Sequence, residues 1–139
     1  MSAVVTPRRP AEQRRPVRPL AIESATLAVF ATLHLTGTLR IGANTSYGAG
    51  VAEALICVAL ACGAAALARS PSRGRRTALF ALGFAIFGFF VGLSFTVGSG
   101  DTIDLVYHAV MLPVLMVTAA LVALSGRPSG SVHNSQKLT

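Results

Sequence analysis

The sequence predicts an all-α integral membrane protein, an up-and-down bundle of four helices with disordered termini. Two observations predict this class. The chain has 139 residues, of which 53% are hydrophobic and 12% charged, whereas about 25% of the residues in an average soluble domain are charged. Its apolar residues also fall into four blocks, each about as long as the 20 residues with which an α-helix crosses a bilayer.

The four blocks define the expected membrane-spanning helices. Polar links of roughly 4 to 9 residues separate them, so each helix must run antiparallel to the one before it. Lipid offers no partner for backbone amide and carbonyl groups, and a helix satisfies these groups within its own segment. The expected spans are 20–41, 49–68, 77–98 and 103–124, which together form one transmembrane bundle, 20–124.

The two ends of the chain are expected to be disordered and cytoplasmic. Residues 1–19 alternate Pro with Arg, and residues 125–139 are rich in Ser and Gly, so neither segment supplies a core. Eleven of the twelve basic residues flank one side of the bundle, and Arg40 alone lies on the other. The positive-inside rule therefore predicts a multi-pass protein of the plasma membrane with both termini in the cytoplasm.

The basic N-terminal arm also indicates a partner. Each Arg near a membrane surface contributes about 1 kcal/mol to binding of anionic lipids. We therefore expect the bilayer, with its anionic lipids, to contact this arm. The arm lacks interleaved aromatic residues, so nucleic acid is not an expected partner.

A few ionisable residues interrupt the apolar blocks near the expected outer face. A rise of 1.5 Å per residue places His34, Glu53 and His108 at similar depths on three different helices. Asp104 and His108 are four residues apart and share a helix face, so Asp104 can orient the imidazole. Ionisable groups within a membrane face the bundle interior. The sequence therefore predicts one polar layer, in which Glu53 and Asp104 are further ligands or orient the histidines.

The ligand of this layer stays open at this stage. His34 and His108 are candidate ligands of a metal ion or of haem iron, with Thr38 and Tyr107 as neighbouring polar groups. The alternative is a set of hydrogen bonds that only fixes helix register. Tyr107 has its own alternative as an aromatic anchor at the membrane interface.

Small residues on the third span indicate close helix packing. Gly88 and Gly92 form a small-xxx-small pair, which lets another backbone approach. The partner is a helix of the same chain, a second copy in a homo-oligomer or a membrane partner protein. A slot for a flat ligand is the alternative. Cys57 and Cys62 point to different sides of one helix and are expected to be packing residues.

The stretch YGAGVAEALICVALACGAAAL, residues 47–67, places Glu53 near the start of a small-residue apolar run. In this stretch and in its four-span layout the chain resembles the DoxX-like group of small four-helix bacterial membrane proteins. The resemblance implies a membrane-embedded accessory protein, with ties to redox and thiol biology, and no defined enzymatic activity. Arginine outnumbers lysine 11 to 1, which together with abundant Ala and Gly suggests a GC-rich bacterial genome.

Three functions remain open from the sequence. The first is a non-catalytic membrane protein whose polar layer binds a metal ion or haem. The second is an interaction or scaffold subunit of a membrane complex that has no ligand. The third is a component of proton-linked transport, in which His and Glu exchange protons. The sequence contains no phosphate-binding glycine loop, nucleophile elbow, H-E-x-x-H motif or Cys-x-x-Cys pair, so it favours a protein that is not an enzyme.

Overall fold

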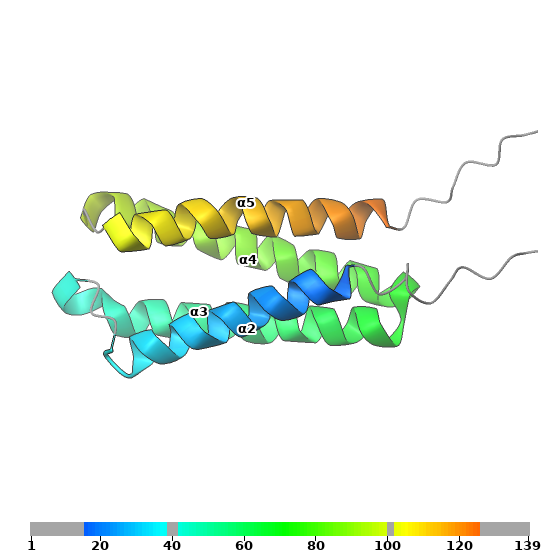
Figure 1. Ribbon diagram of the computed structural model, residues 1–139, viewed down its shortest axis with the longest axis horizontal. Helices are drawn as coiled ribbons and strands as arrows, with labels where there is room; N and C mark the ends of the chain where they lie inside the picture. The colour runs from blue at the N-terminus through cyan, green and yellow to red at the C-terminus, as the bar shows by residue number, and fades with distance from the viewer. Residues whose placement is uncertain (1–15, 39–41, 100–101, 126–139) are drawn as a thin grey trace, which may run out of the picture.

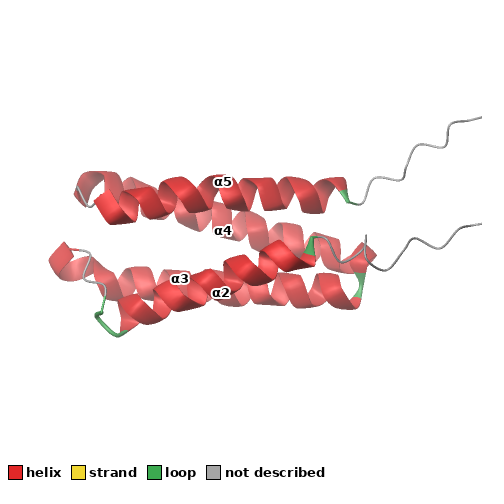
Figure 2. Cartoon of the chain, viewed as in Figure 1, coloured by secondary structure: helices red, strands yellow, loops and turns green. Residues whose placement is uncertain are grey.

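A computed structural model of the chain describes residues 16–38, 42–99 and 102–125, which form α-helices and short turns (Figure 1). No strand occurs in these residues (Figure 2), so the all-α bundle predicted from the sequence is confirmed. Residues 1–15 and 126–139, which hold most of the two predicted disordered segments, lie outside the described residues, as does Arg40. The helices are α2 (Val17–Leu35), α3 (Gly42–Arg69), α4 (Pro71–Ser99) and α5 (Thr102–Leu124).

Each helix packs beside the next one along the chain, in the up-and-down order (Figure 1). Of the helices that neighbour each other around the bundle, α2 and α5 have the fewest close backbone contacts, and side chains join them. The Thr118 hydroxyl of α5 donates a hydrogen bond to Oε1 of Glu23 on α2. The rings of Phe30 and Tyr107 stack with their centroids 4.3 Å apart. The bundle therefore closes through side chains at this seam.

Three of the four described helices are long and apolar enough to cross a membrane: Tyr47–Arg69, Pro71–Gly98 and Thr102–Leu124. Their outward side chains are apolar, and Phe80 for example is 85% exposed. Such a surface suits lipid and not water. The chain is therefore a multi-pass membrane protein in contact with the bilayer.

The first helix ends earlier than the sequence predicted, at Leu35 and not at residue 41. Gly37 has a φ of 70°, a left-handed conformation that glycine adopts without steric cost. The Gly37 N–H donates to the His34 carbonyl at 3.1 Å, and the Thr38 N–H donates to the Leu33 carbonyl at 3.0 Å. These two bonds form a Schellman motif, which ends a helix. His34 therefore lies in the last turn of α2.

The second and third helices begin earlier than predicted, at residues 42 and 71 instead of 49 and 77. Ser70 alone separates α3 from α4. Pro71 suits the first position of α4, because its fixed φ is helical and its missing N–H has no partner there anyway. The turn brings Gly74 against α3, where an added Cβ would lie 2.2 Å from the Ala66 carbonyl oxygen.

We predict that Gly74→Ala destabilises the protein by about 1–3 kcal/mol, the usual cost of overpacking. The Cβ would meet backbone, which cannot move aside as a flexible side chain can. The midpoint of thermal unfolding in detergent measures the effect. Gly83→Ala is the matched control, because an added Cβ at Gly83 has nothing within 4 Å. Equal midpoints for the two variants would contradict this account of the turn.

Candidate functional site

Two histidine–carboxylate pairs occupy the half of the bundle far from the α3–α4 turn. In the first pair, Nδ1 of His34 lies 2.6 Å from Oε2 of Glu53, which joins α2 to α3. Both side chains are buried, with exposures of 1% and 9%. His34 takes this position because the buried stripe of α2 recurs at three- and four-residue steps and ends at His34. Its other ring nitrogen, Nε2, is buried and has no hydrogen-bond partner.

The second pair lies at the start of α5. His108 Nδ1 lies 2.9 Å from the backbone carbonyl oxygen of Asp104, one helical turn earlier, and 3.2 Å from its Oδ1. The Thr96 hydroxyl of α4 donates to the other carboxylate oxygen, Oδ2. A Cβ at Gly92 would lie 2.5 Å from His108 Nε2. The imidazole therefore packs against α4 only because Gly92 has no side chain.

Tyr107 lies between the two pairs. Its ring packs on Phe30 and, with centroids 5.5 Å apart, on Phe89. Its hydroxyl is buried and lies beside the Glu53 carboxylate. The ring thus packs inside the bundle, which is not the position of an anchor in the interfacial belt.

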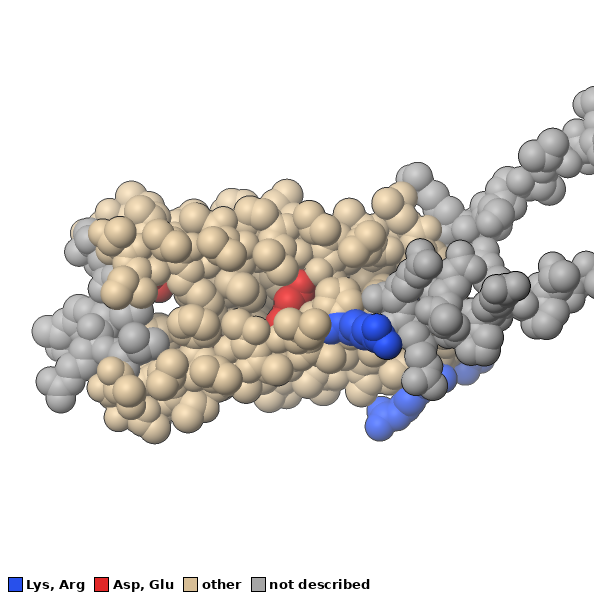
Figure 3. All heavy atoms as spheres, in the orientation of Figure 1, with Lys and Arg blue, Asp and Glu red and all other residues tan. Residues whose placement is uncertain are grey.

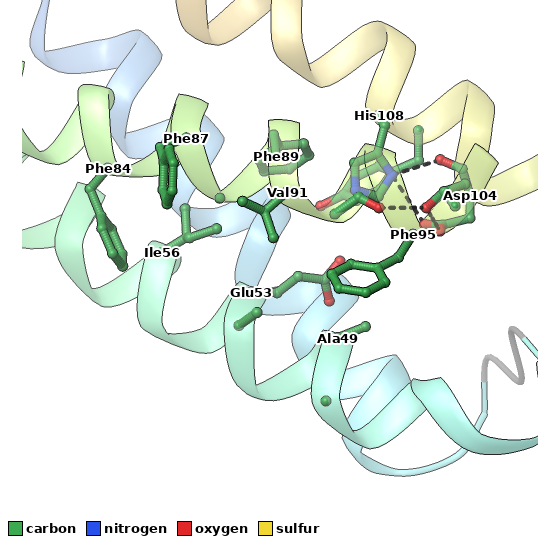
Figure 4. A pocket seen from close by; sticks show the side chains of 16 residues that line it. Ala49, Glu53, Ile56, Phe84, Phe87, Phe89, Val91, Phe95, Asp104 and His108 are labelled. Atoms are coloured by element: carbon green, nitrogen blue, oxygen red, sulfur yellow. Dashed lines mark hydrogen bonds and ion pairs between the residues drawn. The ribbon is translucent and has the colours of Figure 1, made fainter. Parts of the chain in front are cut away.

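A cavity of about 560 Å³ opens between α3, α4 and α5 (Figure 4). Its walls are mainly apolar, and polar side chains from the three helices gather at one end. In Figure 4, Glu53 and Ile56 of α3, Phe87 and Phe95 of α4, and Asp104 and His108 of α5 surround this space. The polar lining residues are Glu53, Thr96, Asp104, Tyr107 and His108.

The structure brings together part of the predicted polar layer. Glu53, Asp104, His108 and Tyr107 line the cavity, whereas His34 lies behind Glu53 and does not line it. Thr38 is exposed in the turn after α2, where its hydroxyl lies 2.9 Å from that of Thr36. Thr38 is therefore not a neighbour of the polar cluster.

Metal binding by His34 and His108 stays a prediction. Within residues 16–38, 42–99 and 102–125, no three His, Cys, Asp or Glu side chains form a group that could hold a metal ion. The two predicted packing glycines have different neighbours. A Cβ at Gly88 would lie 2.7 Å from Ile56 Cδ1 of α3, whereas Gly92 faces His108 of α5.

Sequence reasoning missed several polar contacts between helices, among them Thr96 with Asp104 and Thr118 with Glu23. Thr96 lies about as far before the short link at 100–101 as Asp104 lies after it, and a tight antiparallel connection pairs such positions. The similar distances of Thr96 and Asp104 from the link were therefore the feature of the sequence that could have predicted this contact. The bond between Thr118 and Glu23 joins residues 95 positions apart, and no local spacing indicates it. The second oxygen of Glu23, Oε2, is buried without a partner.

Comparisons with family models, with curated proteins and with solved structures find no match to this chain. The resemblance to DoxX-like proteins therefore stays a prediction from the sequence, and the site must be interpreted from its own geometry.

Proposed function

We propose that this protein is a non-catalytic membrane protein that binds a small membrane-soluble molecule in the cavity between α3, α4 and α5. The observation that carries the proposal is the cavity itself, which has apolar walls and polar side chains at one end. Its volume of about 560 Å³ falls in the range of about 300–1,000 Å³ that is common for ligand sites. The polar end, with Glu53, Asp104 and His108, offers such a molecule hydrogen bonds.

We predict that a neutral, photoreactive long-chain alcohol labels the cavity saturably when the protein is in lipid nanodiscs. Labelling at Phe87 and Val91, mapped by mass spectrometry, should reach a plateau as the probe concentration rises. Phe80 faces outward and does not line the cavity, so its labelling should rise in proportion to the probe. Ala52→Phe should lower the probe's affinity at least tenfold, because Ala52 lines the cavity and the added ring fills it.

Ala61→Phe is the matched control, since Ala61 is exposed on the same helix and does not line the cavity. It should leave the plateau unchanged. Proportional labelling at all three positions would contradict ligand binding. That outcome would favour the scaffold function, in which the polar cluster only fixes helix register.

We also propose that all four helices cross the plasma membrane and that both termini are cytoplasmic. α2 has 19 residues, about 28 Å of helix, which nearly matches a hydrocarbon core of about 30 Å. Its ionisable Glu23 and His34 are buried inside the bundle, and its exposed residues include Ile22 and Val29. Basic side chains gather toward one end of the face shown in Figure 3. The described basic residues stand at the start of α2, the end of α3 and the start of α4: Arg18, Arg69, Arg73, Arg75 and Arg76. The remaining Arg residues of the N-terminal segment would add contact with anionic lipids on that side.

We predict that cysteines introduced at Ser2 and Thr139, in a chain without Cys57 and Cys62, are both protected from an impermeant maleimide in intact cells. Both should react once the membrane is permeabilised. A cysteine at Gly100 should react in intact cells and serves as the positive control. Reaction at Ser2 together with protection at Thr139 would show three crossings and would refute the proposed topology.

A metal ion or haem on His34 and His108 is the second candidate. This candidate is favoured because each of the two imidazoles places its Nδ1 beside a carboxylate. The Nε2 atom of each ring is then the one that would face a ligand. Histidines that bind metals commonly donate their second ring nitrogen to a carboxylate in this way. The buried Nε2 of His34 lacks a partner. It ranks second because His108 lines the cavity and His34 does not.

For this candidate we predict that the purified protein carries stoichiometric metal or shows a haem absorption band. His34→Ala and His108→Ala should each abolish it, and the double variant should be no worse, because two ligands of one ion act as a unit. His133→Ala, which changes the one other histidine of the chain, should retain it. A parent protein without metal or haem would exclude this candidate.

A further inference from the structure

We infer that the cavity selects an organic cation with a bulky apolar body, an inference that rests on the proposed binding function. It combines the charge at the polar end of the cavity, the aromatic rings in its walls and its size.

The polar end presents two carboxylates to the cavity. Glu53 reaches it from α3 and Asp104 from α5. Glu53 is paired with the imidazole of His34, and the partners of Asp104 include the Thr96 hydroxyl and the imidazole of His108. No Lys or Arg is among the described residues that line the cavity, and basic side chains gather toward the opposite end of the face shown in Figure 3. Among the described residues that line the cavity, the two carboxyl groups therefore outnumber the one imidazole, that of His108.

The sign matters more here than it would in water. A carboxylate at membrane depth lacks the screening of bulk solvent, so its interaction with a bound charge is strong. An anion would be repelled by Glu53 and Asp104, and an apolar neutral molecule would leave both without a new partner. A bound cation would interact favourably with both carboxylates.

The aromatic walls favour the same class of ligand. Phe84, Phe87 and Phe95 of α4 line the cavity together with the buried Phe89. In Figure 4 the Phe95 side chain extends from α4 toward α3, the helix that carries Glu53. The face of an aromatic ring attracts an ammonium or phosphonium group, and this attraction strengthens when the group is desolvated. Carboxylates and ring faces thus select the same charge.

The size of the cavity decides between a metal ion and an organic cation. A space of about 560 Å³ is far larger than a single ion. A small ion would leave the space beside the Phe side chains empty. A molecule that fills the space must place apolar groups along the α4 wall and its charge near Glu53. The cavity therefore fits a lipophilic cation.

Three molecules of nearly equal shape test the inference: tetraphenylphosphonium, neutral tetraphenylsilane and anionic tetraphenylborate. Each is added as a competitor while the photoreactive alcohol labels Phe87 in nanodiscs. The three are compared at equal concentrations in the bilayer, which are measured in discs without protein. We expect the phosphonium to compete at least tenfold better than the silane, a difference of about 1.4 kcal/mol. The borate should compete least.

Variants locate the charge that gives this preference. Glu53→Gln should reduce the preference for the phosphonium over the silane at least tenfold, and Asp104→Asn should reduce it less, because Thr96 already donates to that carboxylate. Glu23→Gln is the matched control, since Glu23 is also a buried carboxylate but does not line the cavity. It should leave the preference unchanged. The comparison of the three molecules needs no variant, so it stands even if Glu53→Gln does not fold.

The outcomes separate the two proposals. Equal competition by the phosphonium and the silane, with saturable labelling intact, would overturn the cation inference and leave the binding function standing. An unchanged preference in Glu53→Gln would also overturn it. If labelling of Phe87 is not saturable and none of the three molecules competes, the proposed function falls together with the inference.

Discussion

The structure depends on one constraint: a polar group inside a membrane must find its partner within the protein. The bond between His34 and Glu53 meets this constraint between α2 and α3. Neighbouring helices in lipid gain little from apolar contact alone, because lipid tails are equally apolar. Polar bonds between helices therefore set which faces meet and at what height. Each pair of neighbouring faces except α3 with α4 carries such a bond among the described residues: Ser24 with Cys57, Glu23 with Thr118, and Thr96 with Asp104.

The α3–α4 contact relies on small residues instead, and the cavity follows from that choice. Near the turn, Gly74 lets the two backbones approach closely. Farther along, α3 presents Gly48, Ala49 and Ala52 to the cavity. These small residues leave space beside α3 that the Phe residues of α4 border but do not fill. The cavity opens to the lipid-facing surface, because Phe87 and Phe95, which line it, are 67% and 74% exposed.

The sequence predicted the helices well because their signal is local: an apolar block of membrane length bounded by polar links. The sequence prediction extended the first helix to residue 41, because Arg40 is the one charged residue between Leu35 and that point. In the structure the left-handed Gly37 ends the helix earlier. Spacing also identified Asp104 and His108 as neighbours, since one helical turn separates them. It did not identify Glu53 as the partner of His34, because spacing defines the face of a helix and not the residue opposite it. The cavity depends on side-chain sizes on three helices, and no segment reveals it alone.

Ligand binding in this arrangement would reach the whole bundle. The cavity is lined by α3, α4 and α5, so a molecule within it contacts all three helices. α2 lies outside the lining, yet the bond between His34 and Glu53 ties it to the residue nearest the proposed charge. A ligand that binds only the folded state stabilises it by about 2.7 kcal/mol at one hundred times its Kd. Because Glu53 joins α2 to the cavity, that stabilisation would extend to α2, which does not line the cavity itself. Occupancy would thus be coupled to the stability of all four helices, directly for α3, α4 and α5 and for α2 through Glu53 and the other polar bonds of α2.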